Sequence, residues 1–410
     1  MVADQGEEPS GATSRAADPG RVRRRLVLYV AGFDPASPKK YHRMFLAESA
    51  LQGELTGARY QVGELRQVDA LTSGWTVSAE HPGGARVEVD YRFLHWFDLV
   101  RAAWPKDGLG LLLGACRALG DYFACGLMAR ARAEAPPVYV TALAPPLVGG
   151  AYLVLYALAV AILAASGAVL ADNFGLPWSV GALPPLLLIL AAPWLWARLD
   201  KVLHMGWLAR GMIAVTRSAR GEIPEFAERC RAFAGALAAA AREPSLDEVL
   251  VVSHSMGAQQ AARALGRALI EDPGFGRQGT PVNFLSLGSL LPFYSMTARG
   301  DAPYRDEMAA LVAADWIGWV DVTGPSDPGC AAALHPLTGL DLGEPPGRPD
   351  RRSPRFHLLL TAESYRKLKR TPLEFHFHYL KAMEIAGDYD FFGLVAGPQP
   401  LTAWRREMPA

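Results

Sequence analysis

Two long stretches without a charged side chain limit what this chain of 410 residues can fold into. The first runs from Ala135 to Ala171, about 37 positions, and the second from Asn173 to Ala197, about 25 positions. A helix needs about 20 apolar residues to cross a bilayer, so each run is long enough for one span. Asp172 to Pro177, between them, has the composition of a turn. We therefore predict a transmembrane helical hairpin over residues 136–200.

The charges that flank this hairpin predict its orientation. Arg130 and Arg132 precede the first run, Arg198 and Lys201 follow the second, and the turn carries only Asp172. Basic flanks stay on the cytoplasmic side of a membrane, so both ends of the hairpin are expected to face the cytoplasm. This predicts a membrane protein with two spans whose remaining chain lies in the cytoplasm.

The apolar segments leave several alternatives open. A pair of helices buried in a soluble protein would also lack charges. A re-entrant hairpin that enters one leaflet is a further alternative, because Pro184, Pro185 and Pro193 interrupt the shorter second run. Leu109–Met128 predicts an amphipathic helix that lies either on the membrane surface or on the protein core.

Residues 249–269 predict a reactive serine. The apolar run Val249–Val252 leads into Ser253-His254-Ser255-Met256-Gly257, and a helical pattern follows over Ala258–Leu269. A serine between a buried strand and a helix N-terminus is typical of the nucleophile elbow, whose usual pattern is G-x-S-x-G. Ser253 and Gly257 supply the small residues that the tight turn requires, although a positive φ at Ser253 would strain it. We therefore predict Ser255 as a nucleophile, with free helix N–H groups facing the reacting carbonyl.

Strand and helix patterns alternate along the rest of the chain. The expected strands are Arg25–Val30, Tyr60–Val68, Trp75–Ala79, Ala85–Phe93, Leu246–Val252, Val282–Leu287 and Trp316–Val322, and the expected helices are Ser37–Leu51 and Ile223–Arg242. A hairpin turn is expected at His81–Gly84. This alternation predicts an α/β fold with a doubly wound, mostly parallel sheet whose site lies at the C-terminal ends of the strands.

The predicted organisation has five parts. Residues 1–24 are expected to form a flexible tail, and 25–135 and 201–395 the two parts of the sheet domain around the hairpin. Residues 396–410 are expected to form a C-terminal tail.

In these motifs the chain resembles the α/β-hydrolase superfamily, on its lipase and esterase side. The resemblance covers about residues 25–100 and 215–395, with the hairpin inserted between them. Besides the elbow, Val30-Ala31-Gly32-Phe33 is similar to the family's oxyanion loop, with Ala31 where a histidine is usual. Pro325-Ser326-Asp327-Pro328 stands where the family has its acid, and Leu373–Leu380 where it has its histidine. The chain order Ser, Asp, His is the one this fold uses.

The resemblance implies a Ser–His–Asp triad. Ser255 needs a base within hydrogen-bond reach, and an imidazole oriented by a carboxylate meets that need. His376 is the expected base because a helix is expected to begin at Tyr379, which leaves His376 on the preceding loop. Asp327 is the expected acid. The implied oxyanion donors are the amides of Met256 and Phe33, the latter beside Gly32.

Other residues are alternatives to these assignments or have structural roles. His378 and His357 are alternatives for the base, and Asp321 for the acid. We expect His254 to pack beside the nucleophile and Asp98 to be structural.

These features together predict a membrane-anchored serine hydrolase that cleaves lipid-like acyl esters through an acyl-enzyme. An acyltransferase with the same triad and a non-catalytic membrane scaffold are the alternatives. The expected partners are an acyl-ester or lipid substrate and the bilayer, with no cofactor and no metal. The formal net charge of +0 gives no argument for nucleic acid. The four cysteines have no metal spacing and are expected to be free thiols.

Overall fold

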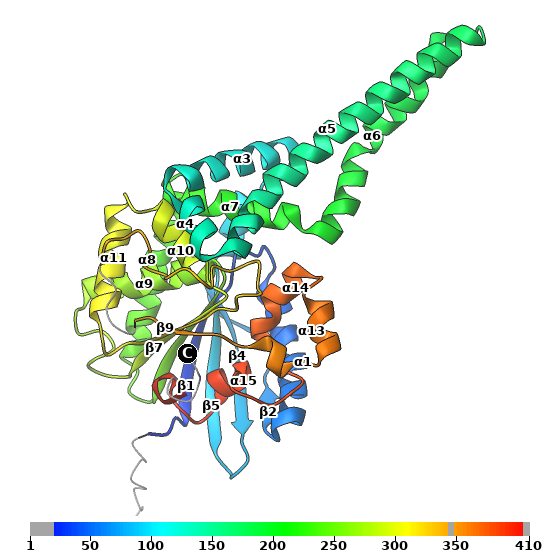
Figure 1. Cartoon of the computed structure of the whole chain (residues 1–410). Helices are drawn as coiled ribbons and strands as arrows, with labels where there is room; N and C mark the ends of the chain where they lie inside the picture. The colour runs from blue at the N-terminus through cyan, green and yellow to red at the C-terminus, as the bar shows by residue number, and fades with distance from the viewer. Residues whose placement is uncertain (1–19, 343–347, 405–410) are drawn as a thin grey trace, which may run out of the picture.

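A computed structural model describes residues 20–342 and 348–404. A nine-stranded sheet carries helices on both faces, and two long helices project from one end of this body (Figure 1). The chain is therefore an α/β protein, as its alternating pattern predicts.

The sheet is mixed. Its strands are β1 (Arg24–Val30), β2 (Arg59–Val62), β3 (Arg66–Asp69), β4 (Thr72–Glu80), β5 (Arg86–Leu94), β6 (Glu248–His254), β7 (Val282–Leu287), β8 (Gly318–Val322) and β9 (Asp350–Arg352). The order is β2-β4-β5-β1-β6-β7-β8-β9, with β3 also paired to β4. Strands β5, β1, β6, β7, β8 and β9 are parallel, whereas β4 runs antiparallel to β5, β2 and β3. The parallel strands thus end at a common edge, which is where a site is expected.

The prediction of a single strand over Tyr60–Val68 is wrong. The chain forms β2 and β3 instead, and both pair with β4. Gly63 lies at the break, where its N–H donates to Thr76 O at 2.8 Å. A Cβ at Gly63 would lie 2.5 Å from Thr76 Oγ1, so a larger residue there would require the Thr76 side chain to move. The hairpin turn at His81–Gly84 is confirmed, since β4 and β5 pair on either side of it.

Successive side chains of a strand point to opposite faces of the sheet. Because both sets are apolar in the central strands, helices cover both faces. They are α1 (Pro38–Thr56), α2 (Phe97–Ala103), α3 (Gly108–Ala124), α4 (Leu127–Glu134), α5 (Pro136–Asn173), α6 (Trp178–Leu203), α7 (Met205–Ala219), α8 (Pro224–Ala241), α9 (Gly257–Glu271), α10 (Leu291–Thr297), α11 (Ala302–Ala313), α12 (Phe356–Leu359), α13 (Ala362–Leu368), α14 (Pro372–Phe377), α15 (Phe391–Ala396) and α16 (Leu401–Trp404). Leu28 and Val251 belong to one buried cluster, which includes α8 and α9 residues. Tyr29 and Val252 belong to the other, with residues of α1 and α15.

The expected C-terminal tail is packed on the body as far as Trp404. Arg25 is fully buried, forms an ion pair with Glu248 at 2.6 Å and donates to the Gly397 carbonyl at 2.9 Å. The Leu401 N–H donates to the same Glu248 carboxylate at 3.0 Å. Two buried charges need hydrogen-bond partners, and residues 397–401 supply several of them, so this segment is part of the fold. Most of the expected N-terminal tail, residues 1–19, lies outside the described residues.

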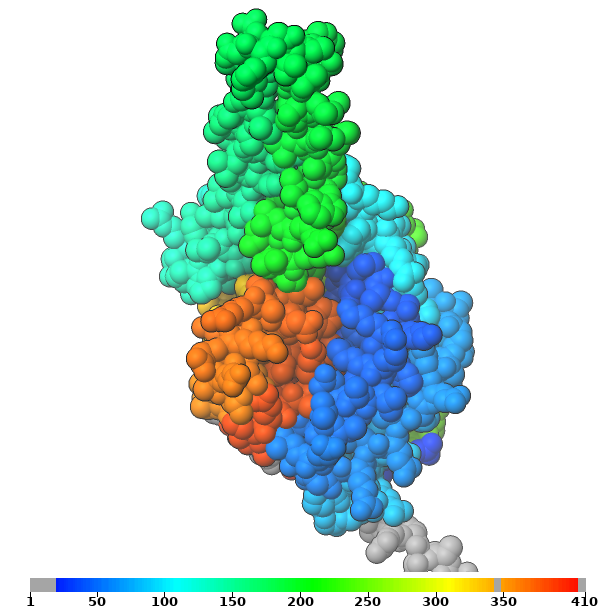
Figure 2. Space-filling view, turned by 90° about the vertical axis from the view of Figure 1, so that its right-hand side faces the viewer, coloured from blue at the N-terminus to red at the C-terminus, as the bar shows by residue number. Residues whose placement is uncertain are grey.

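Helices α5 and α6 are long and apolar enough to span a membrane, and only 6% of the most apolar window of each is buried. They run side by side as a hairpin that stands out from the body (Figure 2). The backbones touch at Gly167 and Gly181, where a Cβ on Gly167 would lie 2.1 Å from Gly181 O. Such contacts between small residues are typical of membrane helix pairs. The two helices are not buried in the core that the described residues form, because the outer part of the hairpin is exposed.

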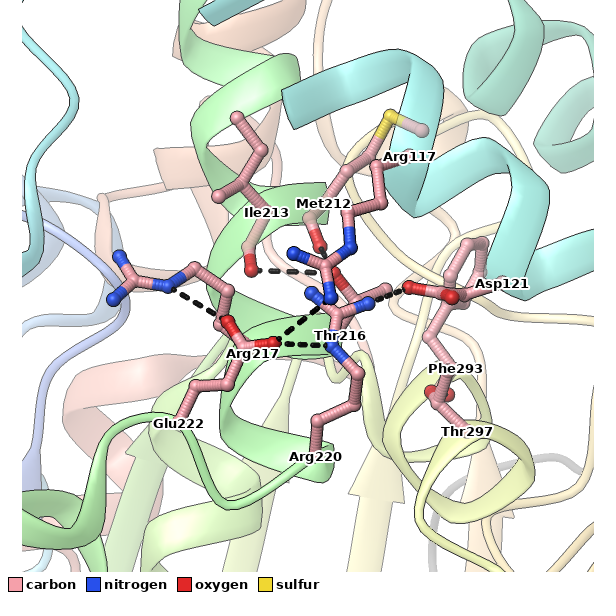
Figure 3. Close-up of polar contacts among 10 residues, drawn as sticks. All are labelled: Arg117, Asp121, Met212, Ile213, Thr216, Arg217, Arg220, Glu222, Phe293 and Thr297. Carbon is pink, nitrogen blue, oxygen red and sulfur yellow. Dashed lines mark hydrogen bonds and ion pairs between the residues drawn. The ribbon is translucent and has the colours of Figure 1, made fainter. Parts of the chain in front are cut away.

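The single helix expected over Leu109–Met128 is wrong, because α3 ends at Ala124 and α4 starts at Leu127 at an angle of 78° to it, but one face of α3 packs on the body. Leu111, Ala115, Ala118 and Tyr122 form the buried face of α3, which contacts α5 and α7. An ion network joins the ends of α3 and α7, because Arg220 pairs with Asp121 and donates to Glu222 (Figure 3). Arg117 and Arg217 contact the same Glu222 carboxylate, at 3.2 and 3.4 Å.

Candidate active site

Ser255 occupies a strained turn between a buried strand and a helix. Strand β6 ends at His254, α9 begins at Gly257, and Ser255 has a φ of 55°. A left-handed conformation costs a non-glycine residue about 1–3 kcal/mol and persists only where its surroundings enforce it. Here the Ser255 N–H donates to Leu287 O at 2.9 Å. The positive φ therefore falls on Ser255 and not on Ser253, which lies buried in the strand.

Gly257 permits this turn to sit against the neighbouring strand. A Cβ at Gly257 would lie 2.3 Å from Val30 O and 2.4 Å from Ala31 O. Both atoms belong to the backbone, so no side chain could move aside. The second small position of the elbow is thus a steric requirement.

The structure brings together Asp327 and His376, which are 49 residues apart. His376 Nδ1 lies 2.8 Å from Asp327 Oδ2, and both side chains are buried. The other carboxylate oxygen, Oδ1, accepts the Gly329 N–H at 2.8 Å. Asp327 follows β8 in a loop that Tyr379 fixes, since the Gly324 N–H donates to the Tyr379 hydroxyl at 2.8 Å. The carboxylate therefore holds His376 in one orientation, with Nε2 available.

The expected position of His376 on a loop is wrong. His376 lies inside α14, which the 3₁₀ helix η1 (His378–Leu380) follows, and the helix expected from Tyr379 does not form. The reason is tertiary. The Tyr379 carbonyl accepts the Tyr389 hydroxyl at 2.6 Å, and the Met383 N–H donates to Gln52 of α1 at 2.9 Å. These partners take the groups that a continuing helix would have paired.

The alternative residues lie elsewhere. His378 is half-buried against the Phe356 ring, with ring centroids 5.1 Å apart, and desolvation lowers its pKa to about 4. Asp321 lies within β8, where it accepts a hydrogen bond from Ser286 Oγ at 2.6 Å and burial raises its pKa. His357 lies on the exposed side of α12 beside Tyr365. None of the three lines the cavities at Ser255 that are described below.

His254 packs against His376 and holds its backbone. The two ring centroids are 4.7 Å apart, and His254 Nε2 lies 2.8 Å from the His376 carbonyl oxygen. Burial, and secondly the proximity of His376, lower the pKa of His254 to about 3. His254 is therefore neutral at physiological pH and donates from Nε2. Asp98 forms an ion pair with Arg229 at 2.7 Å, away from this site.

The loop after β1 lies directly over the serine. A Cβ on Gly32 would lie 2.9 Å from Ser255 Cβ, so only glycine allows the approach. Among the described residues, the N–H groups of Phe33 and Met256 have no hydrogen-bond acceptor. Both residues line a cavity that reaches Ser255. These two amides are therefore free to bind an oxyanion there.

Two residues that sequence reasoning missed hold this loop. Trp96 Nε1 donates to Ala31 O at 2.8 Å. Asp34 accepts the Ala36 N–H and the Tyr41 hydroxyl, both at 2.9 Å. An Asp side chain that accepts the backbone N–H two residues later forms an Asx turn. An Asp in a turn segment is a local signal for this contact, so Asp34 could have been found from the sequence. The Trp96 contact joins residues 65 positions apart, and no local signal marks it.

Two cavities share Ser255, Phe33 and Trp207. The first, about 70 Å³, is mostly apolar and extends between α5, α7 and α10, where its walls include Val138, Ala142, Met212, Val215, Leu290 and Phe293. The second, about 250 Å³, lies between the Phe33 loop and α14 and reaches His376 and Lys40. Trp207 stands against His376, with ring centroids 5.4 Å apart. Both cavities are lined mostly by apolar surface, and the second also has the charged side chains Asp34 and Lys40 in its lining.

The described residues contain no group of three His, Cys, Asp or Glu side chains placed to hold a metal ion. All four cysteines are free thiols. Comparison with family models, curated proteins and solved structures finds no match to this chain.

Proposed function

We propose that this protein is a serine hydrolase of the α/β-hydrolase type that cleaves acyl esters through an acyl-enzyme on Ser255. The observation that carries the proposal is the buried His376–Asp327 pair, whose histidine lines the same cavity as a serine held at a φ of 55°. A nucleophile, a base and an orienting carboxylate are the three groups that this chemistry needs.

Each residue has one role in the proposed reaction. Ser255 Oγ attacks the ester carbonyl while His376 Nε2, which has no partner among the described residues, accepts the hydroxyl proton. Asp327 stabilises the resulting imidazolium, and the Met256 and Phe33 amides bind the oxyanion. The imidazolium then protonates the departing alcohol. Water, deprotonated by His376, releases the acid and restores Ser255.

The walls of the site support a lipid-like acyl substrate. The first cavity is lined mostly by apolar side chains, which would hold an acyl chain by burying it. Two of its walls are α5 and α7, the helices at the base of the hairpin. The acyl group would thus lie beneath the membrane-facing end of the protein.

Labelling with a fluorophosphonate probe tests the reaction. The full-length protein should react covalently, and Ser255→Ala should abolish both labelling and esterase activity. Ser253→Ala is the matched control, because Ser253 is buried two residues earlier and should leave labelling intact. An unreactive wild-type protein that is folded, or labelling that depends on Ser253, would contradict the proposal. Esters of rising chain length would then measure the preference of the apolar cavity.

We also propose that the hairpin crosses the membrane with the body in the cytoplasm. From Gly150 to Asn173, α5 is about 36 Å long at about 1.5 Å per residue, enough for the hydrocarbon core of about 30 Å. A cysteine introduced in place of Asn173, near the tip, should react with an impermeant thiol reagent added from outside intact cells, in a background where Cys116 is replaced because it is exposed. Reaction only after lysis would refute the full span.

A further inference from the structure

A separate cleft lies at the base of the hairpin, outside the site of Ser255. It has a volume of about 450 Å³ and is bounded by the start of α3, by α5 and α6 where they leave the body, and by α7. Binding sites for small molecules measure about 300–1,000 Å³. Helix α7 separates it from the acyl cavity, because Arg210 and Met205 face the cleft whereas Met212 and Leu208 face Ser255.

The cleft is amphipathic. Leu109, Leu112, Leu153 and Trp196 provide apolar walls, and the charged residues that line it are Lys106, Asp107 and Arg210. Asp107 is occupied, because its side chain caps α3 by accepting the Gly110 N–H. The carboxylate nevertheless keeps its charge, so the three charged side chains that line the cleft sum to a net charge of +1.

Both cations are placed to receive an anion. Lys106 has no ion pair among the described residues and is exposed. Arg210 donates from Nε to Pro105 O at 3.2 Å and stacks on the Trp104 ring at 4.9 Å, which fixes the guanidinium plane. Asp200 of α6 accepts the Gly206 N–H at 2.7 Å and forms no ion pair with Arg210 within 4 Å among the described residues, although its charge still favours the charged form of the guanidinium.

The position of the cleft identifies the occupant. Exposed apolar side chains continue along α5 and α6 outward from the cleft, with Leu153 46% and Trp194 58% exposed, so the cleft lies at the end of the proposed span that is nearer the body. Tryptophans and basic residues at this level are typical of the headgroup region. A ligand that offers a phosphate to two cations and acyl chains to leucines and a tryptophan is a phospholipid.

We propose that this cleft binds one phospholipid with a net anionic headgroup, with its phosphate between Lys106 and Arg210 and its acyl chains along α5 and α6. The proposal rests on the membrane location of the hairpin but not on the chemistry at Ser255. Helices α3 and α7, whose first turns line the cleft, are joined at their opposite ends by the ion network of Asp121, Arg220 and Glu222 (Figure 3).

Native mass spectrometry of the full-length protein in detergent tests this site. Dioleoyl phosphatidylglycerol should bind the wild type at least tenfold more tightly than dioleoyl phosphatidylcholine, since each cation near an anionic headgroup is worth about fivefold in affinity. The variant Lys106→Ala/Arg210→Ala should lose this preference. Lys106→Arg/Arg210→Lys should retain it because the charges are kept. Glycerol phosphate, which lacks acyl chains, should not compete.

Matched controls separate the cleft from surface charge and from catalysis. Arg198→Ala/Lys201→Ala removes two cations near the same end of α6 that do not line the cleft, and it should keep the preference. Ser255→Ala should bind lipid as the wild type does, so a failed hydrolase proposal leaves this result unchanged. No preference in the folded wild type, or equal loss in the Arg198/Lys201 pair, would overturn the site. A protein that stays soluble without detergent would instead refute the membrane hairpin.

Discussion

Replacing Asp327 by asparagine removes one charge from the candidate active site while keeping its shape. The side-chain oxygen of the asparagine can still accept the Gly329 N–H, which Asp327 Oδ1 accepts at 2.8 Å. The amide nitrogen would then occupy the place of Oδ2, 2.8 Å from His376 Nδ1. A donor there forces the proton of the neutral imidazole onto Nε2, the atom that must accept the Ser255 proton.

The expected loss follows from the charge that is removed. In the transition state the imidazolium faces a carboxylate with charge centres about 4 Å apart, and this pair is worth about 4 kcal/mol at an effective dielectric constant of about 20. A loss of about 4 kcal/mol lowers the rate about 10³-fold. Because both side chains are buried, little of this interaction is screened by solvent.

The assay is kcat for hydrolysis of a chromogenic ester by the detergent-purified full-length protein. Asp321→Asn is the matched control, because Asp321 is buried six positions earlier and accepts a hydrogen bond from Ser286. Burial raises the pKa of Asp321, so the neutral substitution there should change kcat by less than about threefold. Melting temperatures of both variants should stay close to that of the wild type. Near-normal turnover in Asp327→Asn, or a larger loss in Asp321→Asn, would refute the reasoning.

Three further perturbations test the membrane span, a buried histidine and the elbow. Leu155→Arg should cost about 2.5–3.5 kcal/mol of insertion and shift the protein toward carbonate-extractable material, unlike Leu155→Ile. Because the pKa of His254 is about 3 in the folded protein and about 6.5 unfolded, the unfolded chain binds the extra proton between these values. Stability should fall by about 1.4 kcal/mol per pH unit from this residue as pH drops below 6.5, and His254→Gln should show a correspondingly shallower loss of melting temperature between pH 6.5 and 5. Gly257→Ala should destabilise by about 1–3 kcal/mol, because its Cβ would meet Val30 O at 2.3 Å, whereas Gly235→Ala on α8 meets nothing within 4 Å and should not.

Local sequence patterns were sufficient to predict several elements of the fold. An uncharged run long enough for a span is visible in the sequence because a bilayer-spanning helix excludes charge along its whole length. The strand Val282–Leu287 is found at its predicted bounds because an apolar run between turn residues has few other conformations. The elbow is local as well, since strand, turn and helix follow each other within about twenty residues.

The register of distant segments was decided only by the tertiary structure. The sequence offered several histidines and two aspartates, and only the fold places His376 and Asp327 2.8 Å apart. The conformation of residues 376–383 was mispredicted because Tyr389 and Gln52, remote in the chain, take the backbone groups that a helix would use. Trp96 likewise donates a hydrogen bond to the Ala31 carbonyl, and no residue spacing in the sequence predicts this contact. Periodicity records which face of a segment is buried, whereas contacts across the sheet depend on how separate segments align, and that alignment is set by packing the whole core.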